Sequence, residues 1–217
     1  MPVLHAGSVA ALAPDGGDSV QRAVRILNPT DRAVVLGSAE PESHIDLNAA
    51  RSAGLQVVRR RSGGGAVLVE PGRMLWVDVV IPVDDLYWES DVGRAFWWLG
   101  EAWADALAAA GVRDATVWRG ALARSRWSDR VCFAGVGPGE VVVGDQKVVG
   151  ISQRRTRAGA LFQCAVPVMW EPDRLVAVLA LSDEERSAAS AELGVAALGL
   201  GDRVAAGLVP ALLDRLA

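Results

Sequence analysis

The chain has 217 residues, of which 51% are hydrophobic, and it carries a formal net charge of −4 at pH 7. This length suffices for one well-buried domain, expected over residues 1–217, and the acidic balance argues against nucleic acid as the main ligand, because such binders usually carry a basic face. Two cysteines form no disulfide framework, residues 1–10 lack a leader pattern, and no stretch reaches the roughly 20 apolar residues of a membrane span. We therefore expect a cytoplasmic protein that contacts neither membrane nor nucleic acid.

Apolar patterning predicts the elements of the first third of the chain. Apolar residues at helical spacing before Pro29 predict a short amphipathic helix over residues 19–28. The patterns that follow predict, in chain order, a buried strand at 33–38, a helix at 45–53, a strand at 55–60, its partner strand at 66–69 and a central strand at 74–81.

Asp78 is the one charged residue in the apolar run 74–81. A carboxylate in a strand could hold Mg²⁺ or an arginine. The more common arrangement is a sheet edge with the carboxylate in solvent, and that is what we expect here.

The longest predicted helix covers residues 90–110, with Ser90 as its N-cap. Trp97, Trp98 and Trp103 lie within it and could form an aromatic ligand box. At helical spacing such residues more often belong to the core, which we predict for all three.

Short strands separated by turns dominate the next part, and connections this short favour antiparallel pairing. The fold class is therefore predicted as α/β (α+β), with a mixed, mostly antiparallel sheet flanked by helices. Ser182 and Glu185 have the spacing of a capping box and begin a small helical C-terminal extension, residues 182–217. The remaining predicted elements are strands at 115–118, 131–134, 140–143, 147–152 and 160–166, and a helix at 172–180.

A basic, glycine-rich run spans residues 59–67 and reads Arg-Arg-Arg-Ser-Gly-Gly-Gly-Ala-Val. Fixed positive charge beside a backbone without Cβ atoms suits a bound phosphate or carboxylate. The run matches neither the P-loop nor the dinucleotide-binding fingerprint. On the glycines alone, a flexible hairpin turn with solvated charges is an equal alternative.

Lys147 is the only lysine in the chain, and arginine supplies every other basic side chain. It lies in the segment 144–155, between two glycines in a strand-rich region. A compact ammonium with rotatable donors differs from a planar guanidinium, so its retention here indicates a specific role.

Together these two segments suit an acyl-phosphate or acyl-adenylate, whose transition state spreads negative charge over carboxylate and phosphate oxygens. Histidine catalysis is not expected, because His5 and His44 lie outside both motifs, and the chain offers no set of zinc ligands. ATP with Mg²⁺ stays open as a cofactor on the residues alone, and we expect no metal site built by the protein alone.

The two motifs resemble the catalytic domain shared by lipoate-protein ligases, octanoyltransferases and, more distantly, biotin-protein ligases. The resemblance covers roughly residues 33–180 and implies the catalytic fold of class II synthetases and biotin ligases. It implies an enzyme that activates lipoate or octanoate with ATP and transfers the acyl group to a lysine of an acceptor domain. It also implies Lys147 as the catalytic residue that contacts carbonyl and phosphate oxygens. The residues it implies for substrate or adenylate binding are Arg59, Arg60, Ser62, Gly63, Gly64, Gly65, Ala66, Gly150 and Ser152.

Two alternatives stay open. Cys132 matches the position of the acyl-accepting cysteine in one octanoyltransferase group, so the chain could be an octanoyltransferase that takes its acyl group from octanoyl-carrier protein through a thioester. The chain could also be a non-catalytic relative that binds lipoyl groups or adenylates. Where ligases tend to carry Arg-Asn-Asp, this chain has Pro138-Gly139-Glu140.

The resemblance further implies the protein partners. The acceptor is expected to be the lipoyl domain of a 2-oxoacid dehydrogenase or the glycine-cleavage H protein. The family's ligases often carry a larger C-terminal accessory domain for which 217 residues leave no room, so a separate accessory subunit is a further candidate partner, as is acyl carrier protein.

Overall fold

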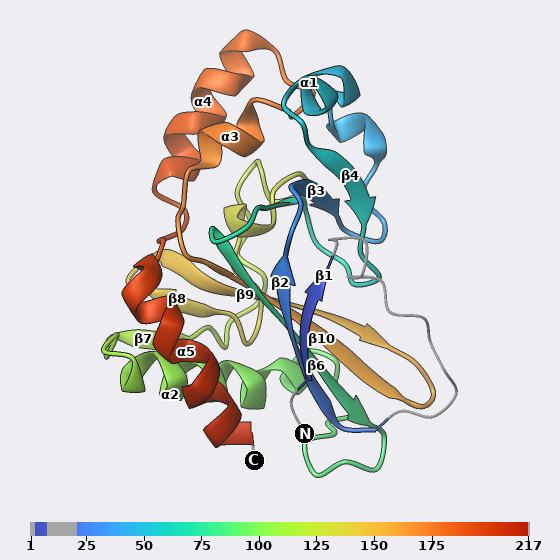
Figure 1. Ribbon diagram of the computed structural model, residues 1–217, viewed down its shortest axis with the longest axis vertical. Coiled ribbons are helices and arrows are strands. Elements are labelled where there is room, and N and C mark those ends of the chain that lie inside the picture. The colour runs from blue at the N-terminus through green and yellow to red at the C-terminus, as the bar shows by residue number, and fades with distance from the viewer. Residues whose placement is uncertain (1–2, 8–20, 217) are drawn as a thin grey trace.

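The computed structural model describes residues 3–7 and 21–216 and shows two β-sheets flanked by helices (Figure 1). The large sheet has the strand order β1-β2-β6-β10-β9-β8-β7, and within it only the β1–β2 pair is parallel. A three-stranded sheet with the order β4-β3-β5 lies near α1, toward the top of Figure 1. The predicted fold class, a mixed and mostly antiparallel sheet flanked by helices, is confirmed.

The elements have the following bounds. The strands of the large sheet are β1 (Val3–Gly7), β2 (Ala23–Pro29), β6 (Met74–Pro82), β7 (Ala115–Val117), β8 (Val141–Val143), β9 (Gln146–Arg155) and β10 (Gly159–Pro167). Those of the small sheet are β3 (Ala33–Leu36), β4 (Gln56–Arg59) and β5 (Val67–Val69). The helices are α1 (Leu47–Ser52), α2 (Trp97–Ala109), α3 (Pro172–Val176), α4 (Asp183–Gly194) and α5 (Gly201–Leu216), with 3₁₀ turns η2 (Glu42–His44), η3 (Arg94–Phe96) and η4 (Cys132–Ala134).

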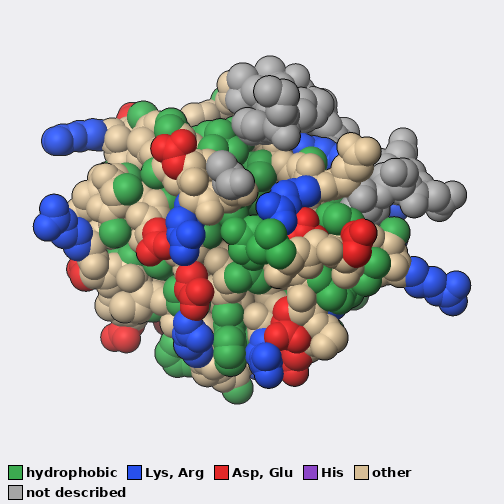
Figure 2. Space-filling model, turned by 90° about the horizontal axis from the view of Figure 1, so that it is seen from below, with side chains coloured by type: hydrophobic (Ala, Val, Ile, Leu, Met, Phe, Trp, Pro, Cys, Tyr) green, Lys and Arg blue, Asp and Glu red, His purple; other side chains and the backbone are tan. Residues whose placement is uncertain are grey.

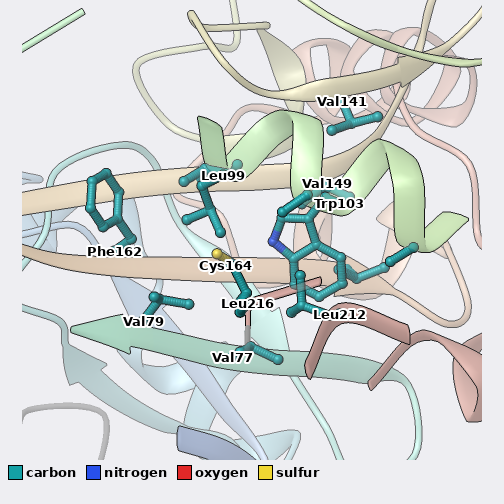
Figure 3. Close-up of a cluster of buried hydrophobic side chains, with 14 of the residues drawn as sticks. Val77, Val79, Leu99, Trp103, Val141, Val149, Phe162, Cys164, Leu212 and Leu216 are labelled. Atoms are coloured by element: carbon teal, nitrogen blue, oxygen red, sulfur yellow. The ribbon is translucent and has the colours of Figure 1, made fainter. Parts of the chain in front are cut away.

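The main core lies between the large sheet and the helices α2 and α5. Figure 3 shows Trp103 of α2 and Leu212 of α5 directed at Val77 and Cys164 on the sheet. Trp103 is fully buried, as the helical spacing predicts. Because α5 completes this core, the C-terminal extension packs on the domain and does not project from it.

The other two tryptophans of α2 lie at the margin of this core. Trp98 stacks on Tyr87 with ring centroids 4.5 Å apart and packs against the buried cluster. Trp97 is half-buried beneath the guanidinium of Arg119, which lies 5.0 Å from its ring.

On the face shown in Figure 2, acidic and basic side chains lie next to one another among hydrophobic ones. Within the described part of the chain, no helix has the length and apolar character needed to span a membrane.

Two sequence predictions about the first third of the chain are wrong. Residues 23–28 of the predicted helix 19–28 belong to strand β2, whereas residues 19 and 20 lie outside the described part of the chain. Val24 and Ile26 are β-branched, and β2 pairs with β6 on one side and β1 on the other, so sheet pairing overrides a short helical pattern. Strands β4 and β5 are not partners of each other, because both pair with β3.

Two further elements differ from the predictions. Helix α2 begins at Trp97 after the turn η3, and the backbone N–H of Arg94 is capped by Asp91 at 2.8 Å, not by Ser90. The predicted strand at 131–134 is the 3₁₀ turn η4. Its chain pairs with the glycine run only at the single bridge between Ala66 and Val131.

The prediction that Asp78 lies at a sheet edge in solvent is also wrong. β6 lies between β2 and β10, and Asp78 is only 1% exposed. Its Oδ1 accepts hydrogen bonds from Trp76 Nε1 at 2.9 Å and from Gln163 Nε2 at 3.2 Å. Burial raises the pKa of Asp78 to about 6, although both hydrogen bonds oppose the shift.

The raised pKa of Asp78 predicts a loss of stability with rising pH. The folded state keeps a proton that the unfolded state releases near pH 4, so this group weakens folding as the pH rises from about 4 to about 6. In the variant Asp78→Asn this loss should be absent, a difference of about 3 kcal/mol in the pH dependence of the unfolding free energy. Urea unfolding at pH 4, 5, 6 and 7 measures it, and parallel pH profiles for both proteins would contradict the assignment.

Candidate active site

A cleft of about 600 Å³ opens between the glycine-rich run and the η4–β9 region. The glycines Gly63–Gly65 line it together with the turn residues around Glu40 and His44 and the residues from Cys132 to Gln153 that carry Lys147. Phe96 and residues of the segment 122–129 complete the lining. The fold therefore brings together the two sequence motifs, which are separated by some eighty residues in the chain.

The three glycines have different structural roles. A Cβ on Gly65 would lie 2.7 Å from the backbone nitrogen of Val131, and a Cβ on Gly37 would lie 1.8 Å from the carbonyl oxygen of Gly64. Gly64 itself has a φ of +98°, in the region that favours glycine. Only at Gly63 would a Cβ meet nothing within 4 Å, and this glycine lines the cleft. The positive φ thus explains Gly64, close packing explains Gly65, and Gly63 offers open backbone to a ligand.

The arginines of the run hold its backbone in place. Arg60 is 2% exposed and donates to the carbonyl oxygens of Val35, Gly63 and Gly65 at 3.2, 2.7 and 3.0 Å. Burial lowers the pKa of Arg60, and the nearby Cys132, Glu40 and Glu140 oppose this. Arg59 donates to the carbonyls of Gly37 and Glu40 at 2.7 and 2.6 Å. The carbonyls that these two arginines hold belong to the loops at the cleft and to strand β3.

Lys147 is 1% exposed at the start of β9, and its ammonium contacts three oxygen atoms. Nζ lies 3.0 and 3.1 Å from the two carboxylate oxygens of Glu140 and donates to the carbonyl of Cys132 at 2.5 Å. The ring of Phe133 lies 5.0 Å from Nζ. A buried ammonium requires such a partner, because an unpaired charge in the interior is costly.

Glu140 is the main partner that the sequence analysis missed. Besides Lys147, it accepts from the backbone N–H groups of Gly137 at 2.7 Å and Ile151 at 3.0 Å. In the sequence it is noticed only as a difference from the family pattern. A carboxylate seven residues before the only lysine, directly before the first strand of the β8–β9 hairpin, was the available signal.

A buried hydrogen-bonded chain leads from the cleft into the sheet. Ser152 Oγ, at the cleft, lies 2.8 Å from Ser62 Oγ, which donates to Gln163 Oε1 at 2.7 Å. Gln163 donates in turn to Asp78. Since the single proton of Ser62 is directed at Gln163, Ser152 is the donor to Ser62. Ser62 is 1% exposed and does not itself line the cleft.

The remaining predicted residues lie around Lys147. Cys132 is half-buried in η4 with its thiol at the cleft, and its N–H donates to Ala66 at 3.0 Å. Ala66 is buried and joins the glycine run to η4. A Cβ on Gly150 would lie 3.5 to 3.6 Å from Glu140, Phe133 and Cys132, so Gly150 borders the ion pair closely.

Glu40 and His44 were not predicted as site residues, yet both line the cleft. Glu40 is 6% exposed, and burial raises its pKa to about 7 while its hydrogen bond from Gly37 opposes the shift. His44 Nδ1 lies 3.6 Å from Glu40 Oε1. His44 was not expected to be catalytic because it lies outside both motifs in the sequence. The link between β3 and α1 nevertheless brings it to the cleft.

The comparisons with known proteins agree on one family. Residues 14–199 match the family model described as the lipoyl protein ligase A/B catalytic domain. A curated relative, lipoate-protein ligase A subunit 1 of Thermoplasma acidophilum, is 27% identical over 156 residues, which is 71% of this chain. The chain spans only 54% of that relative's length.

Solved structures share the fold. One, described as a bi-partite lipoate protein ligase and its E2 lipoyl domain from T. acidophilum, has a TM-score of 0.68 and 20% identity, and covers 91% of this chain and 73% of its own. Another, described as lipoate-protein ligase A bound with ATP, has a TM-score of 0.67 and 22% identity, and covers 100% of this chain and 84% of its own.

The different roles of the glycines give a matched pair of variants. Gly65→Ala forces a Cβ against the Val131 backbone and should destabilise the fold by about 2 kcal/mol or more. Gly63→Ala meets open space and should change stability by less than about 1 kcal/mol. It should nevertheless weaken binding of an acyl-sulfamoyl adenosine, a stable mimic of an acyl-adenylate. Thermal unfolding and calorimetry measure the two effects, and unchanged affinity in Gly63→Ala would show that the run is only a turn.

Proposed function

The chain belongs to the lipoyl protein ligase A/B catalytic-domain family, and from this premise we propose that it activates lipoate with ATP and transfers the lipoyl group to a lysine of an acceptor domain. The observation that carries the proposal is the position of Lys147. The only lysine of the chain lies buried at the cleft that the glycine run borders.

Lys147 would stabilise the charge that develops during both half-reactions. When a carboxylate oxygen attacks the α-phosphate of ATP, and when the acceptor amine later attacks the acyl carbonyl, negative charge accumulates on oxygens near Nζ. A preorganised ammonium stabilises that charge without reorganisation. Glu140 and the Cys132 carbonyl hold Nζ in place, so the group is positioned before the substrate arrives.

The cleft offers groups for each part of the adenylate. Phe96, Leu122 and Ile151 are apolar lining residues suited to an acyl chain, and lipoate and octanoate both fit that description. The open backbone at Gly63 suits a phosphate or carboxylate oxygen. Mg²⁺ is usually held by one or two carboxylates together with substrate phosphates, and the carboxylate of Asp129 at the cleft fits this requirement. When bound there, the ion would neutralise phosphate charge.

The roles of the other predicted residues belong to the same proposal. Arg59 and Arg60 act on the ligand through the loops they hold, and Ser62 acts through Ser152. The acceptor is a lipoyl domain of a 2-oxoacid dehydrogenase or the H protein, and the reaction takes place in the cytoplasm. A neighbouring structure is described as bi-partite, which supports an accessory subunit as a partner of this chain.

A second candidate rests on Cys132. This residue lines the cleft, and its backbone carbonyl accepts a hydrogen bond from Lys147. In that reaction the thiolate displaces the carrier thiol from octanoyl-carrier protein, and the acceptor amine then displaces Cys132. The net result is octanoyl transfer without ATP.

The direct test is the intact mass of a lipoyl domain incubated with this protein. One reaction holds lipoate and ATP·Mg²⁺, and another holds octanoyl-carrier protein. Each is run with and without the accessory subunit. A lipoyl mass increase that requires ATP supports the ligase, whereas an octanoyl increase without ATP supports the transferase. Binding of the acyl-sulfamoyl adenosine without any transfer would instead indicate a non-catalytic relative.

Replacing Lys147 tests its role within the ligase reaction. Lys147→Arg keeps the charge but puts a planar, larger group where a compact ammonium fits, and transfer should fall by about 10² to 10³-fold. Thermal unfolding shows whether the fold is kept. The exposed Arg157→Lys is the matched control and should transfer at the normal rate. Turnover near the normal rate in Lys147→Arg would exclude Lys147 as the catalytic residue.

Replacing Cys132 distinguishes ligase from transferase. Cys132→Ser should keep lipoylation with ATP within a few-fold, because an adenylate needs no thiol. Cys164 is the control, since it is fully buried and burial raises the pKa of its thiol to about 12. A hydroxylamine-labile octanoyl adduct on the native protein and on Cys164→Ala, but not on Cys132→Ser, would overturn the ligase proposal.

A further inference from the structure

Glu40 and His44 form a carboxylate–imidazole pair at the cleft that the adenylation chemistry does not use. Both belong to the link between β3 and α1, four residues apart in the chain, and His44 is the last residue of the turn η2. Their facing atoms, Glu40 Oε1 and His44 Nδ1, are 3.6 Å apart. Among the described residues, neither atom has a hydrogen-bond partner, although both atoms are buried.

The rest of each side chain is fixed in a way that orients the pair. Glu40 Oε2 accepts from the backbone N–H of Gly37 at 3.3 Å, and the carbonyl of Glu40 accepts from Arg59. The carbonyl of His44 accepts from the N–H of Ala180 at 2.8 Å. Because Nδ1 faces Glu40, Nε2 is on the opposite edge of the ring, and 23% of the His44 side chain is exposed at the cleft.

We propose that His44 is the general base that takes a proton from the attacking amine of the acceptor lysine, and that Glu40 is the positioning residue that holds the imidazole in the required tautomer. The inference rests on the proposed function, since it assigns the second half-reaction to residues of the same cleft. A carboxylate that orients a base through its Nδ1–H is a recurring catalytic arrangement.

The proton and bond changes balance without any further reactant. The acceptor lysine enters as the free amine, and its nitrogen forms a bond to the acyl carbonyl carbon. The bond from that carbon to the phosphate oxygen breaks, and AMP leaves with the electron pair. One N–H proton passes to His44 Nε2, so the nitrogen becomes a neutral amide and the ring becomes an imidazolium beside the Glu40 carboxylate.

The charges around the pair support this assignment. Burial lowers the pKa of His44, as does Arg130, while Asp129 opposes the shift, so the ring is neutral at pH 7 and able to accept a proton. Burial raises the pKa of Glu40 to about 7, and the bond from Gly37 together with the charges of Arg60 and Arg59 opposes it. The carboxylate that orients the ring therefore forms mainly above pH 7.

The experiment measures the two half-reactions separately on the complete protein. Transfer is measured in single turnover from synthetic lipoyl-AMP to the lipoyl domain, and adenylation is measured as pyrophosphate release from ATP with lipoate. His44→Ala should lose about 10² to 10³-fold in transfer and stay within about threefold in adenylation. Imidazole added to His44→Ala should restore part of the transfer rate. The exposed Glu42→Gln, on the same turn, is the matched control.

The variant Glu40→Gln tests the positioning residue through its pH profile. In the native protein the transfer rate should rise through about pH 7 as Glu40 ionises, and this rise should be missing in Glu40→Gln. Normal transfer in His44→Ala, or an equal loss of adenylation and transfer without rescue by imidazole, would overturn the inference. If the native protein makes no lipoyl-AMP yet transfers from synthetic lipoyl-AMP in a His44-dependent way, the inference holds and the ATP-dependent function fails.

Discussion

The buried ion pair between Lys147 and Glu140 is the constraint on which the site depends. An ammonium that is 1% exposed must keep its partner, because an unpaired buried charge costs several kcal/mol. Glu140 also accepts from two backbone N–H groups, Gly137 and Ile151. The loop before β8 and the middle of β9 are thereby fixed around one carboxylate, and η4 is fixed through the Cys132 carbonyl.

A second buried cation completes the arrangement on the opposite wall. Arg60 holds the carbonyls of the glycine run, and its field reaches Glu40, Glu140 and Cys132. An acidic protein thus places two desolvated cations beside one cleft, where their charge is less screened than at the surface. Under the proposed function, this local charge is what lets a chain of net −4 bind an anionic intermediate.

The sequence predicts best those features that depend on short-range chemistry. The capping box of Ser182 and Glu185 starts α4 as expected, and the apolar run 74–81 is a central strand. The lone lysine and the run of three glycines are unusual enough to single out two segments of the sequence. The fold brings both segments to one cleft.

Features that depend on long-range contacts could not be predicted in the same way. Residues 23–28 carry a helical spacing that sheet pairing overrides, and Asp78 is buried because β6 has a neighbour on both sides. Glu140 becomes a partner of Lys147 only through the β8–β9 hairpin. His44 reaches the cleft only because the link after β3 folds over it, and no sequence pattern predicts how this link folds.

The central claim is that Lys147 binds the acyl-adenylate at this cleft. A crystal structure of the protein with lipoyl-sulfamoyl adenosine tests it most directly. The account predicts the sulfamoyl group within about 3 Å of Lys147 Nζ, against the open backbone of Gly63, with the lipoyl chain along Leu122 and Ile151. The analogue bound at another surface, with Lys147 contacting only Glu140 and Cys132, would contradict it.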